Sequence, residues 1–165
     1  MKQLVVSCHP NPESFNAALR RTLEDELRRL EQQVIVRDLF QMGFDPVRTL
    51  DEMRGESRQG IPQAVLIEQK HIAWADILTL VFPIWWAGMP AQLKGYLDRV
   101  LACGFAYVLD ADGYRGLLEK KGLMIINTTG TPFNDLKHTG MLESMNQTIE
   151  GSFRFCGMHI LGHTY

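Results

Sequence analysis

The residues of this chain that are best suited to chemistry lie in three short stretches, each of which follows an apolar run. The first stretch contains His9, Ser14 and Asn16, just before a helical pattern. The N–H groups at a helix N-terminus carry partial positive charge, and a hydroxyl, an amide and an imidazole beside them can bind an anion such as a phosphate. An ordinary capped helix with a loop histidine would contain the same residues, so this stretch alone leaves both interpretations open.

The second stretch is aromatic. Trp85 and Trp86 follow the apolar run 77–82 and precede Gly88 and Pro90. Two indoles on a loop offer a surface on which a flat, conjugated ligand can stack. Two core tryptophans that cap a strand are the competing interpretation.

The third stretch is Thr128-Thr129-Gly130-Thr131. Its hydroxyls and the backbone N–H groups of Gly130 and Thr131 could hold the carbonyl edge of a heterocycle and stabilise negative charge on it. A polar turn after a strand is the alternative. The chain contains no Gly-x-Gly-x-x-Gly motif and no P-loop lysine, which argues against a nucleoside triphosphate as the ligand.

The order of the elements predicts how these stretches meet. Apolar runs at 4–7, 34–36, 77–82, 123–127 and 158–161 predict strands, and helical patterns at 15–30, 61–75, 90–100 and 141–153 alternate with them. This alternation predicts a single α/β domain over 1–165, with an open parallel five-stranded sheet of flavodoxin-like order 2-1-3-4-5 and helices on both faces. The helix that usually follows the fifth strand is missing, and residues from 40 to about 59 are expected to form a long surface loop.

In that strand order, the carboxyl ends of strands one, three and four lie side by side, and ligands of open α/β sheets bind at such ends. The anion site, the aromatic surface and the row of donors are therefore expected to converge. A ligand that satisfies all three carries a phosphate and a planar ring, and flavin mononucleotide (FMN) is the simplest candidate.

The composition excludes several other classes of protein. The chain is 45% hydrophobic and 22% charged, as expected for a globular domain. Its net charge of −2 and its pI of about 6.2 argue against nucleic acid as the main partner. Three cysteines without metal-ligand spacing fit a reducing cytoplasm and indicate no metal site, and no stretch is long enough for membrane insertion.

Six motifs together resemble the NAD(P)H:quinone oxidoreductase family of flavoproteins. They are His9-Pro10 with Ser14-Phe15-Asn16-Ala17, the run from Asp38 to Pro46, the run from Phe82 to Pro90 with Leu93-Lys94-Gly95, Gly104-Phe105-Ala106-Tyr107, Thr128-Thr129-Gly130, and Phe155-Cys156-Gly157. They occur in the family's order and extend over nearly the whole chain.

The resemblance implies a flavodoxin-like homodimer with a flavin, FMN or alternatively FAD, at each subunit boundary. It also implies a ping-pong reaction in which NAD(P)H reduces the flavin and a quinone or similar acceptor then takes both electrons. The implied cofactor-binding residues are His9, Ser14, Phe15, Asn16 and Ala17 on the phosphate side, Pro83, Ile84, Trp85 and Trp86 along the ring, and Thr128, Thr129, Gly130 and Thr131 at the pyrimidine edge. Tyr107 from the other subunit and His138 are the implied catalytic residues. The loop before Ile61 is shorter than in members that use FAD, which favours FMN.

The chain departs from the family pattern after Gly130. Better-known members have a second glycine there, followed by a tyrosine and a histidine that are thought to relay charge from the reduced ring. Here Thr131-Pro132 replaces the glycine, Leu136 stands about where the tyrosine would be, and His138 lies near the histidine position.

Three further functions compatible with the predicted fold differ from that of a reductase. Some relatives bind and activate a potassium-efflux transporter, so a flavin-binding regulatory subunit with a membrane transporter as partner is the alternative function. A flavodoxin that carries single electrons usually has a hydroxyl-rich phosphate loop and a strongly acidic surface, and this sequence shows neither. A receiver domain needs clustered acidic residues after the first strand, where this chain has Ser7-Cys8-His9.

Overall fold

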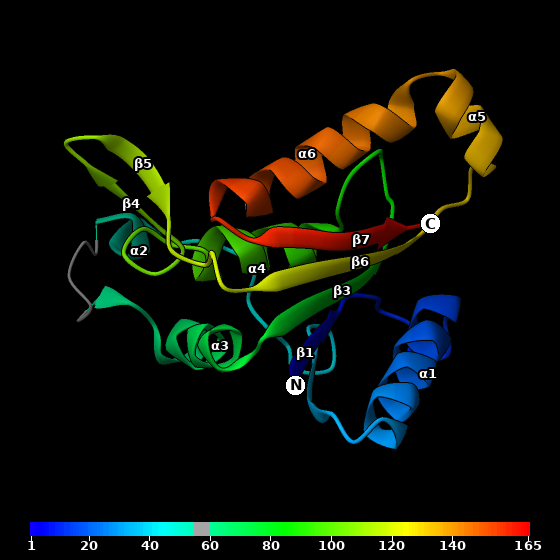
Figure 1. The fold of residues 1–165 in the computed structure, drawn as a ribbon, viewed down its shortest axis with the longest axis horizontal. Coiled ribbons are helices and arrows are strands. Elements are labelled where there is room, and N and C mark those ends of the chain that lie inside the picture. Colours follow the sequence, from blue (N-terminus) through cyan, green and yellow to red (C-terminus); the bar gives the residue numbers. More distant parts are fainter. Residues whose placement is uncertain (55–59) are drawn as a thin grey trace.

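The computed structural model describes residues 1–54 and 60–165. Five parallel strands form one sheet in the order β2-β1-β3-β6-β7 (Figure 1). They are β1 (Lys2–Ser7), β2 (Gln33–Asp38), β3 (Ile77–Pro83), β6 (Gly122–Thr128) and β7 (His159–Thr164). Because β6 and β7 are the fourth and fifth strands of this sheet, the predicted order 2-1-3-4-5 is confirmed.

Helices cover both faces of the sheet. On one face, α1 (Phe15–Arg29) packs against β1, β2 and β3. On the other face lie α3 (Gln63–Trp74), α4 (Ala91–Val100) and α6 (Met141–Phe155), and Figure 1 shows α6 running alongside β7. The remaining elements are α2 (Leu50–Arg54), α5 (Phe133–His138) and an antiparallel hairpin of β4 (Tyr107–Asp110) and β5 (Gly113–Gly116).

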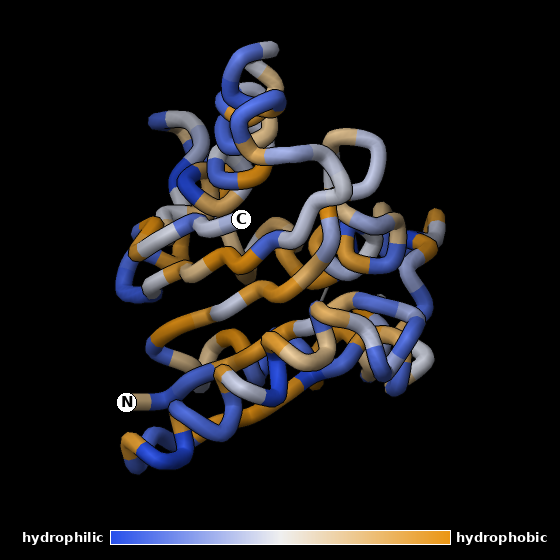
Figure 2. Tube along the Cα trace, turned by 90° about the vertical axis from the view of Figure 1, so that its right-hand side faces the viewer, coloured by the Kyte–Doolittle hydropathy of each residue, from blue (hydrophilic) through white to orange (hydrophobic). Residues whose placement is uncertain are grey.

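The core lies between the sheet and the face with three helices. Leu4 of β1 is in register with Leu78 of β3, which is in register with Leu123 of β6, and all three are buried. Their chain neighbours Val5 and Thr79 are also buried, on the face toward α1. Successive strand residues point to opposite faces, so strands covered on both sides are apolar throughout. The apolar residues in Figure 2 accordingly follow the central strands.

Three local predictions were wrong in part. The expected loop at 40–59 contains α2, whose first turn forms a capping box in which Thr49 Oγ1 accepts from the Glu52 N–H and Glu52 Oε2 accepts from the Thr49 N–H, at 3.3 and 2.8 Å. Residues 55–59 of the expected loop lie outside the part of the chain that the structure describes. The segment between the helical pattern 90–100 and the strand 123–127, where no element was expected, contains the β4–β5 hairpin, whose turn is possible because Gly113 adopts a φ of 107°. Residues 133–138 form α5, where no helix was expected.

The last strand leaves part of one sheet face thinly covered. On the α1 side, Met124 and Ile126 of β6 are half-buried, and Leu161 of β7 is exposed. Over the described part of the chain, the helices are too short or too polar to cross a membrane.

Candidate functional site

The carboxyl ends of β1, β3 and β6 open into one cavity of about 850 Å³, called here the three-loop cavity. Of the thirteen residues predicted to bind a cofactor, the twelve that line it are His9, Ser14, Phe15, Asn16, Pro83, Ile84, Trp85, Trp86, Thr128, Thr129, Gly130 and Thr131. Ala17 does not line the cavity; it is buried, and its N–H donates to Ser14 Oγ at 3.1 Å. The three stretches therefore converge as the strand order predicts.

The N-terminus of α1 gives this cavity its electrostatic character. Ser14 is the N-cap, and no acidic residue occupies the first turn. The N–H groups of Phe15 and Asn16 have no intrahelical partner, as is general for a first helical turn. Among the described lining residues none is acidic and one, His9, is titratable. This end of the cavity suits an anion.

Asn16 carries an unpaired polar atom in this cavity. Its side chain donates from Nδ2 to Thr128 Oγ1 at 2.7 Å, whereas Oδ1 is buried with no partner among the described residues. The amide could also point its oxygen toward the Thr128 hydroxyl, and its NH₂ group would then be the unpaired one. A buried unpaired polar group costs roughly 1–3 kcal/mol, so a ligand that supplies the missing partner in either orientation would recover that free energy.

The two tryptophans belong to a strained turn rather than to the core. Trp85 and Gly88 exchange two backbone hydrogen bonds of 3.0 and 3.1 Å, and the residues between them, Trp86 and Ala87, have φ values of 52° and 58°. A left-handed conformation costs a non-glycine residue about 1–2 kcal/mol. The turn leaves Trp86 fully exposed and Trp85 41% exposed, with the Trp85 ring edge-on to His9 at 5.9 Å.

The third loop is joined directly to the second, because Ile84 N–H donates to the Thr128 carbonyl at 2.7 Å. Within it, Thr131 N–H already donates to Thr129 Oγ1 at 3.1 Å. The expected donor at Thr131 is thus used internally. A side-chain carbon added at Gly130 would meet no atom within 4 Å, so its backbone stands in open space.

Sequence reasoning missed the apolar residues that close the cavity. Leu136 of α5 and Met141 and Met145 of α6 line it, and Leu136 and Met145 are buried. The position where the family pattern has a tyrosine is therefore an apolar part of the lining. His138 is exposed at the end of α5 and does not line the three-loop cavity.

Tyr107 lies in a second cavity of about 580 Å³, which adjoins the first at Ala87. The Tyr107 ring packs edge-on against Phe155 with centroids 5.1 Å apart, and Tyr114 lies 5.4 Å from the same phenylalanine. Tyr114 and Phe155 are exposed. Within one chain, the structure does not bring Tyr107 into the three-loop cavity.

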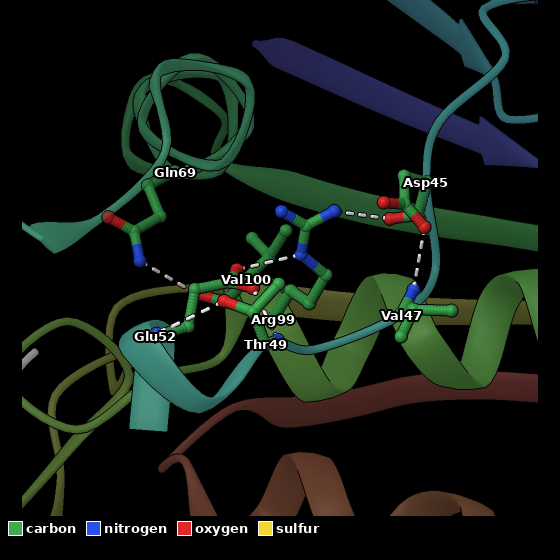
Figure 3. A network of polar contacts seen from close by, with 7 residues as sticks. All are labelled: Asp45, Val47, Thr49, Glu52, Gln69, Arg99 and Val100. Carbon is green, nitrogen blue, oxygen red and sulfur yellow. Dashed lines mark hydrogen bonds and ion pairs between the residues drawn. The ribbon is translucent and has the colours of Figure 1, made fainter. Parts of the chain in front are cut away.

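A buried ion pair positions one edge of this second cavity. The side chains of Arg99 and Glu52 are 6% and 7% exposed and pair at 2.7 Å, and Arg99 also donates to the Asp45 carbonyl (Figure 3). Burial alone would raise the pKa of the Glu52 carboxyl, but hydrogen bonds from the Thr49 N–H and from Arg99 outweigh burial and lower it. The segment that carries Arg48, which lines the cavity, is thereby held against α4.

Comparison with known proteins relates this geometry to one family. A family model described as a flavodoxin-like fold matches residues 1–165. A Haemophilus influenzae protein named uncharacterized NAD(P)H oxidoreductase is 38% identical over 160 residues, which make up 96% of this chain and 79% of that protein. A ribosyldihydronicotinamide dehydrogenase (quinone) from Pongo abelii is 33% identical over 97% of this chain and 78% of its own length.

Solved structures show the same similarity. The NAD(P)H:quinone oxidoreductase from Methanothermobacter marburgensis superposes with a TM-score of 0.85 at 29% identity, over 98% of this chain and 84% of that chain. An FMN-dependent NADH-azoreductase from Bacillus anthracis, solved in complex with FMN, superposes with a TM-score of 0.74 at 18% identity, over 99% and 86% of the two chains. The second likeness concerns the fold alone.

Proposed function

Since this chain belongs to the flavodoxin-like family of NAD(P)H:quinone oxidoreductases, we propose that it is a flavin-dependent oxidoreductase that passes two electrons from NAD(P)H to a quinone or a similar acceptor. The observation that carries the proposal is the three-loop cavity, in which an anion site, two indoles and a row of donors meet. No single stretch would support it alone.

The cavity residues fit a flavin on chemical grounds. The free N–H groups of the first turn of α1 suit the phosphate, and among the described residues no carboxylate lines the cavity to repel it. The unpaired Oδ1 of Asn16 can accept a hydrogen bond from a hydroxyl of the ligand. Trp85 and Trp86 offer aromatic surface beside the ring. The Thr128 hydroxyl and the Gly130 N–H suit a carbonyl edge. FMN needs no more than these groups, and FAD is the alternative.

The chain's own residues would bind and orient the reactants, because the redox chemistry belongs to the cofactor. A bound flavin supplies the capacity to accept a hydride from NAD(P)H and to return both electrons to an acceptor. We propose that both substrates use the same exposed side of the cavity beside Trp86 in turn, which makes the reaction ping-pong. The apolar lining at Leu136 and Met145, both buried, would exclude water from that side of the cavity.

A homodimer would complete the site. Tyr107 lies on the β4–β5 side of the chain within an exposed aromatic cluster, outside the three-loop cavity. We propose that this surface packs on a second copy, so that Tyr107 of one subunit faces the substrate side of the other subunit's cavity. Sedimentation of the purified protein with and without FMN tests this arrangement, and a monomer under both conditions would exclude it.

The proposed function is tested by absorption spectroscopy of the purified protein after addition of FMN, and separately of FAD. We expect flavin bands that bleach when NADPH or NADH is added without oxygen and that return on addition of a quinone. A reduced protein that releases oxidised nicotinamide before the quinone is added would support the ping-pong order. No binding of either flavin would contradict the proposal, whereas binding without bleaching would favour a regulatory flavoprotein.

A further inference from the structure

A buried histidine lies on β7, next to β6, the strand whose carboxyl end lines the three-loop cavity. The side chain of His163 on β7 is 4% exposed, and both of its ring nitrogens have partners. Nε2 lies 2.7 Å from Asn127 Oδ1 on β6, and Nδ1 lies 3.0 Å from Glu150 Oε1 on α6. Sequence reasoning did not single out this histidine, and the proposed reaction does not use it.

The Asn127 side chain links this histidine to the strands that end in the cavity. Asn127 Nδ2 donates to the carbonyl of Phe82 on β3 at 3.1 Å. The residues that follow Asn127 and Phe82 are Thr128 and Pro83, which both line the cavity. The orientation of the Asn127 amide therefore bears on how β6 and β3 enter the proposed flavin site.

Hydrogen-bond accounting shows that the histidine and its glutamate need a proton between them. Because the Asn127 amide group donates to Phe82, its oxygen can only accept, so Nε2 of His163 must carry a hydrogen. A neutral imidazole then presents a lone pair from Nδ1 toward a carboxylate oxygen of Glu150. The contact becomes a hydrogen bond only when one proton is added to the pair.

The charged and titratable groups around His163 are few. On α6, the second oxygen of Glu150 accepts from Arg154 at 2.9 Å. On its own strand end, the Tyr165 ring stacks on His163 at 4.8 Å and donates its hydroxyl to Asn146 at 2.6 Å. On β6 the facing group is the neutral Asn127. Burial lowers the pKa of His163, and the hydrogen bond and charge of Glu150 partly oppose this shift.

We propose that His163 is a positioning residue for the flavin site and that proton uptake by the His163–Glu150 pair strengthens flavin binding. With the proton bound, both ring nitrogens of His163 make hydrogen bonds, and the ring fixes the Asn127 side chain. Without the proton, the Nδ1 lone pair of His163 and the Glu150 carboxylate repel each other, and the contact between the ends of β6 and β3 loosens. The inference rests on the proposed function, because flavin affinity is the quantity that the network controls.

The experiment measures FMN affinity by quenching of flavin fluorescence between about pH 5.5 and 8.5, the range in which histidine changes charge. The test variants are His163→Gln, which cannot take up the proton, and Glu150→Gln, whose amide can donate to the neutral ring. His159→Gln is the matched control, because His159 is an exposed histidine of the same strand. The FMN phosphate changes its charge in the same pH range in all four experiments, so the diagnostic quantity is the difference between the pH profiles of FMN affinity of the four proteins.

Both test variants should lose the gain in FMN affinity that acidification gives the wild type. When the pH is lowered from about 8.5 to 5.5, the FMN affinity of the wild type and of His159→Gln should increase about fivefold more than that of His163→Gln. A fivefold effect lies at the lower end of the range known for coupling between two sites. Glu150→Gln should keep the tight binding at high pH, because the amide satisfies Nδ1 without a proton. The ¹⁵N shifts of His163 in the flavin-free protein should show the wild-type ring gaining a proton over the same pH range.

Three outcomes separate this inference from the function that underlies it. If wild type binds no flavin at any pH, the proposed function fails. If all four proteins bind FMN with parallel pH profiles, the function stands and the role of His163 is overturned. If His163→Gln fails to fold by circular dichroism, the Glu150→Gln profile decides, because a wild-type pH dependence in that variant overturns the inference.

Discussion

The three-loop cavity and the Arg99–Glu52 network are both rich in polar atoms, but they differ in how those atoms are paired. In the network, Glu52 accepts from Arg99 and from a backbone N–H, and Arg99 donates to a carbonyl as well. In the cavity, an amide atom of Asn16 has no partner among the described residues, and two residues of the Trp85–Gly88 turn are strained. The paired groups of the network hold the fold together, whereas the unpaired amide and the strained turn of the cavity lie beside a helix N-terminus and two exposed indoles, and this combination marks the place where a ligand is expected.

The largest expected effect breaks the network. Arg99→Met leaves the Glu52 carboxylate buried without its partner, which should lower the free energy of unfolding by about 3 kcal/mol. Urea denaturation measures the change. Lys94→Met is the matched control, because the Lys94–Asp98 pair is 61% and 46% exposed and should contribute less than about 1 kcal/mol. Equal losses in the free energy of unfolding for the two variants would show that the buried ion pair stabilises the fold no more than the exposed one does.

A second change acts on the cavity and should spare the fold. Asn16→Asp keeps the shape of the side chain and can still accept from the Thr128 hydroxyl, but it places a negative charge beside the expected phosphate. FMN affinity should fall about thirtyfold, which corresponds to about 2 kcal/mol. Riboflavin, which lacks the phosphate, serves as the control ligand and should lose much less. A parallel loss for both ligands in fluorescence titrations would show that Asn16 does not face the phosphate.

The strain in the Trp85–Gly88 turn permits a change with opposite effects on stability and binding. Trp86→Gly relieves a left-handed φ and should raise the free energy of unfolding by about 1 kcal/mol. The same variant should bind flavin more weakly, because it loses the exposed indole. Ala87→Gly relieves the neighbouring residue, keeps the indole and should stabilise without weakening binding. Thermal melts and FMN titrations of both variants check the pair, and a destabilised Ala87→Gly would refute the claim of strain.

The smallest effect depends on pH. The pKa of Glu52 in the folded chain lies below its ordinary value of 4.5, so the unfolded chain binds more protons in acid. The stabilisation from the ion pair is therefore complete above about pH 4.5 and is lost as the pH falls through the folded value. Glu52→Gln should have a lower free energy of unfolding than wild type at neutral pH, and this difference should become smaller below about pH 4.5. Urea denaturation at several pH values measures this difference. A difference that stays constant in acid would show that the Glu52 carboxylate does not stabilise the fold through its ion pair.

Much of the sheet and of the site could be predicted, because the signals are local. Strands such as 77–82 are continuous apolar runs, and the carboxyl ends of neighbouring parallel strands meet whatever the loops contain. Spacing along the chain thus sufficed to bring His9, Trp85 and Thr128 together. The hairpin of β4 and β5 was missed although Asp112-Gly113 is a turn signal, and α2 was missed although Thr49 and Glu52 have capping-box spacing.

The remainder depends on contacts that no local pattern encodes. Leu136, Met141 and Met145 reach the cavity only because α5 and the start of α6 fold back over it. The partners of His163 lie 13 and 36 residues away in the sequence, so a reading of β7 alone does not distinguish this histidine from the exposed His159. Whether His138 and Tyr107 act in catalysis stays a prediction.

The hydrogen bond between Asn16 and Thr128 joins residues 112 positions apart, and this distance has a kinetic consequence. The two residues meet only after β1, β3 and β6 have paired, and long-range parallel pairing is slow because the chain loses loop entropy before contacts compensate for it. The cavity is therefore completed late in folding. A flavin that binds only the finished cavity would lengthen the lifetime of the native state by slowing unfolding, and it would leave the rate of folding unchanged.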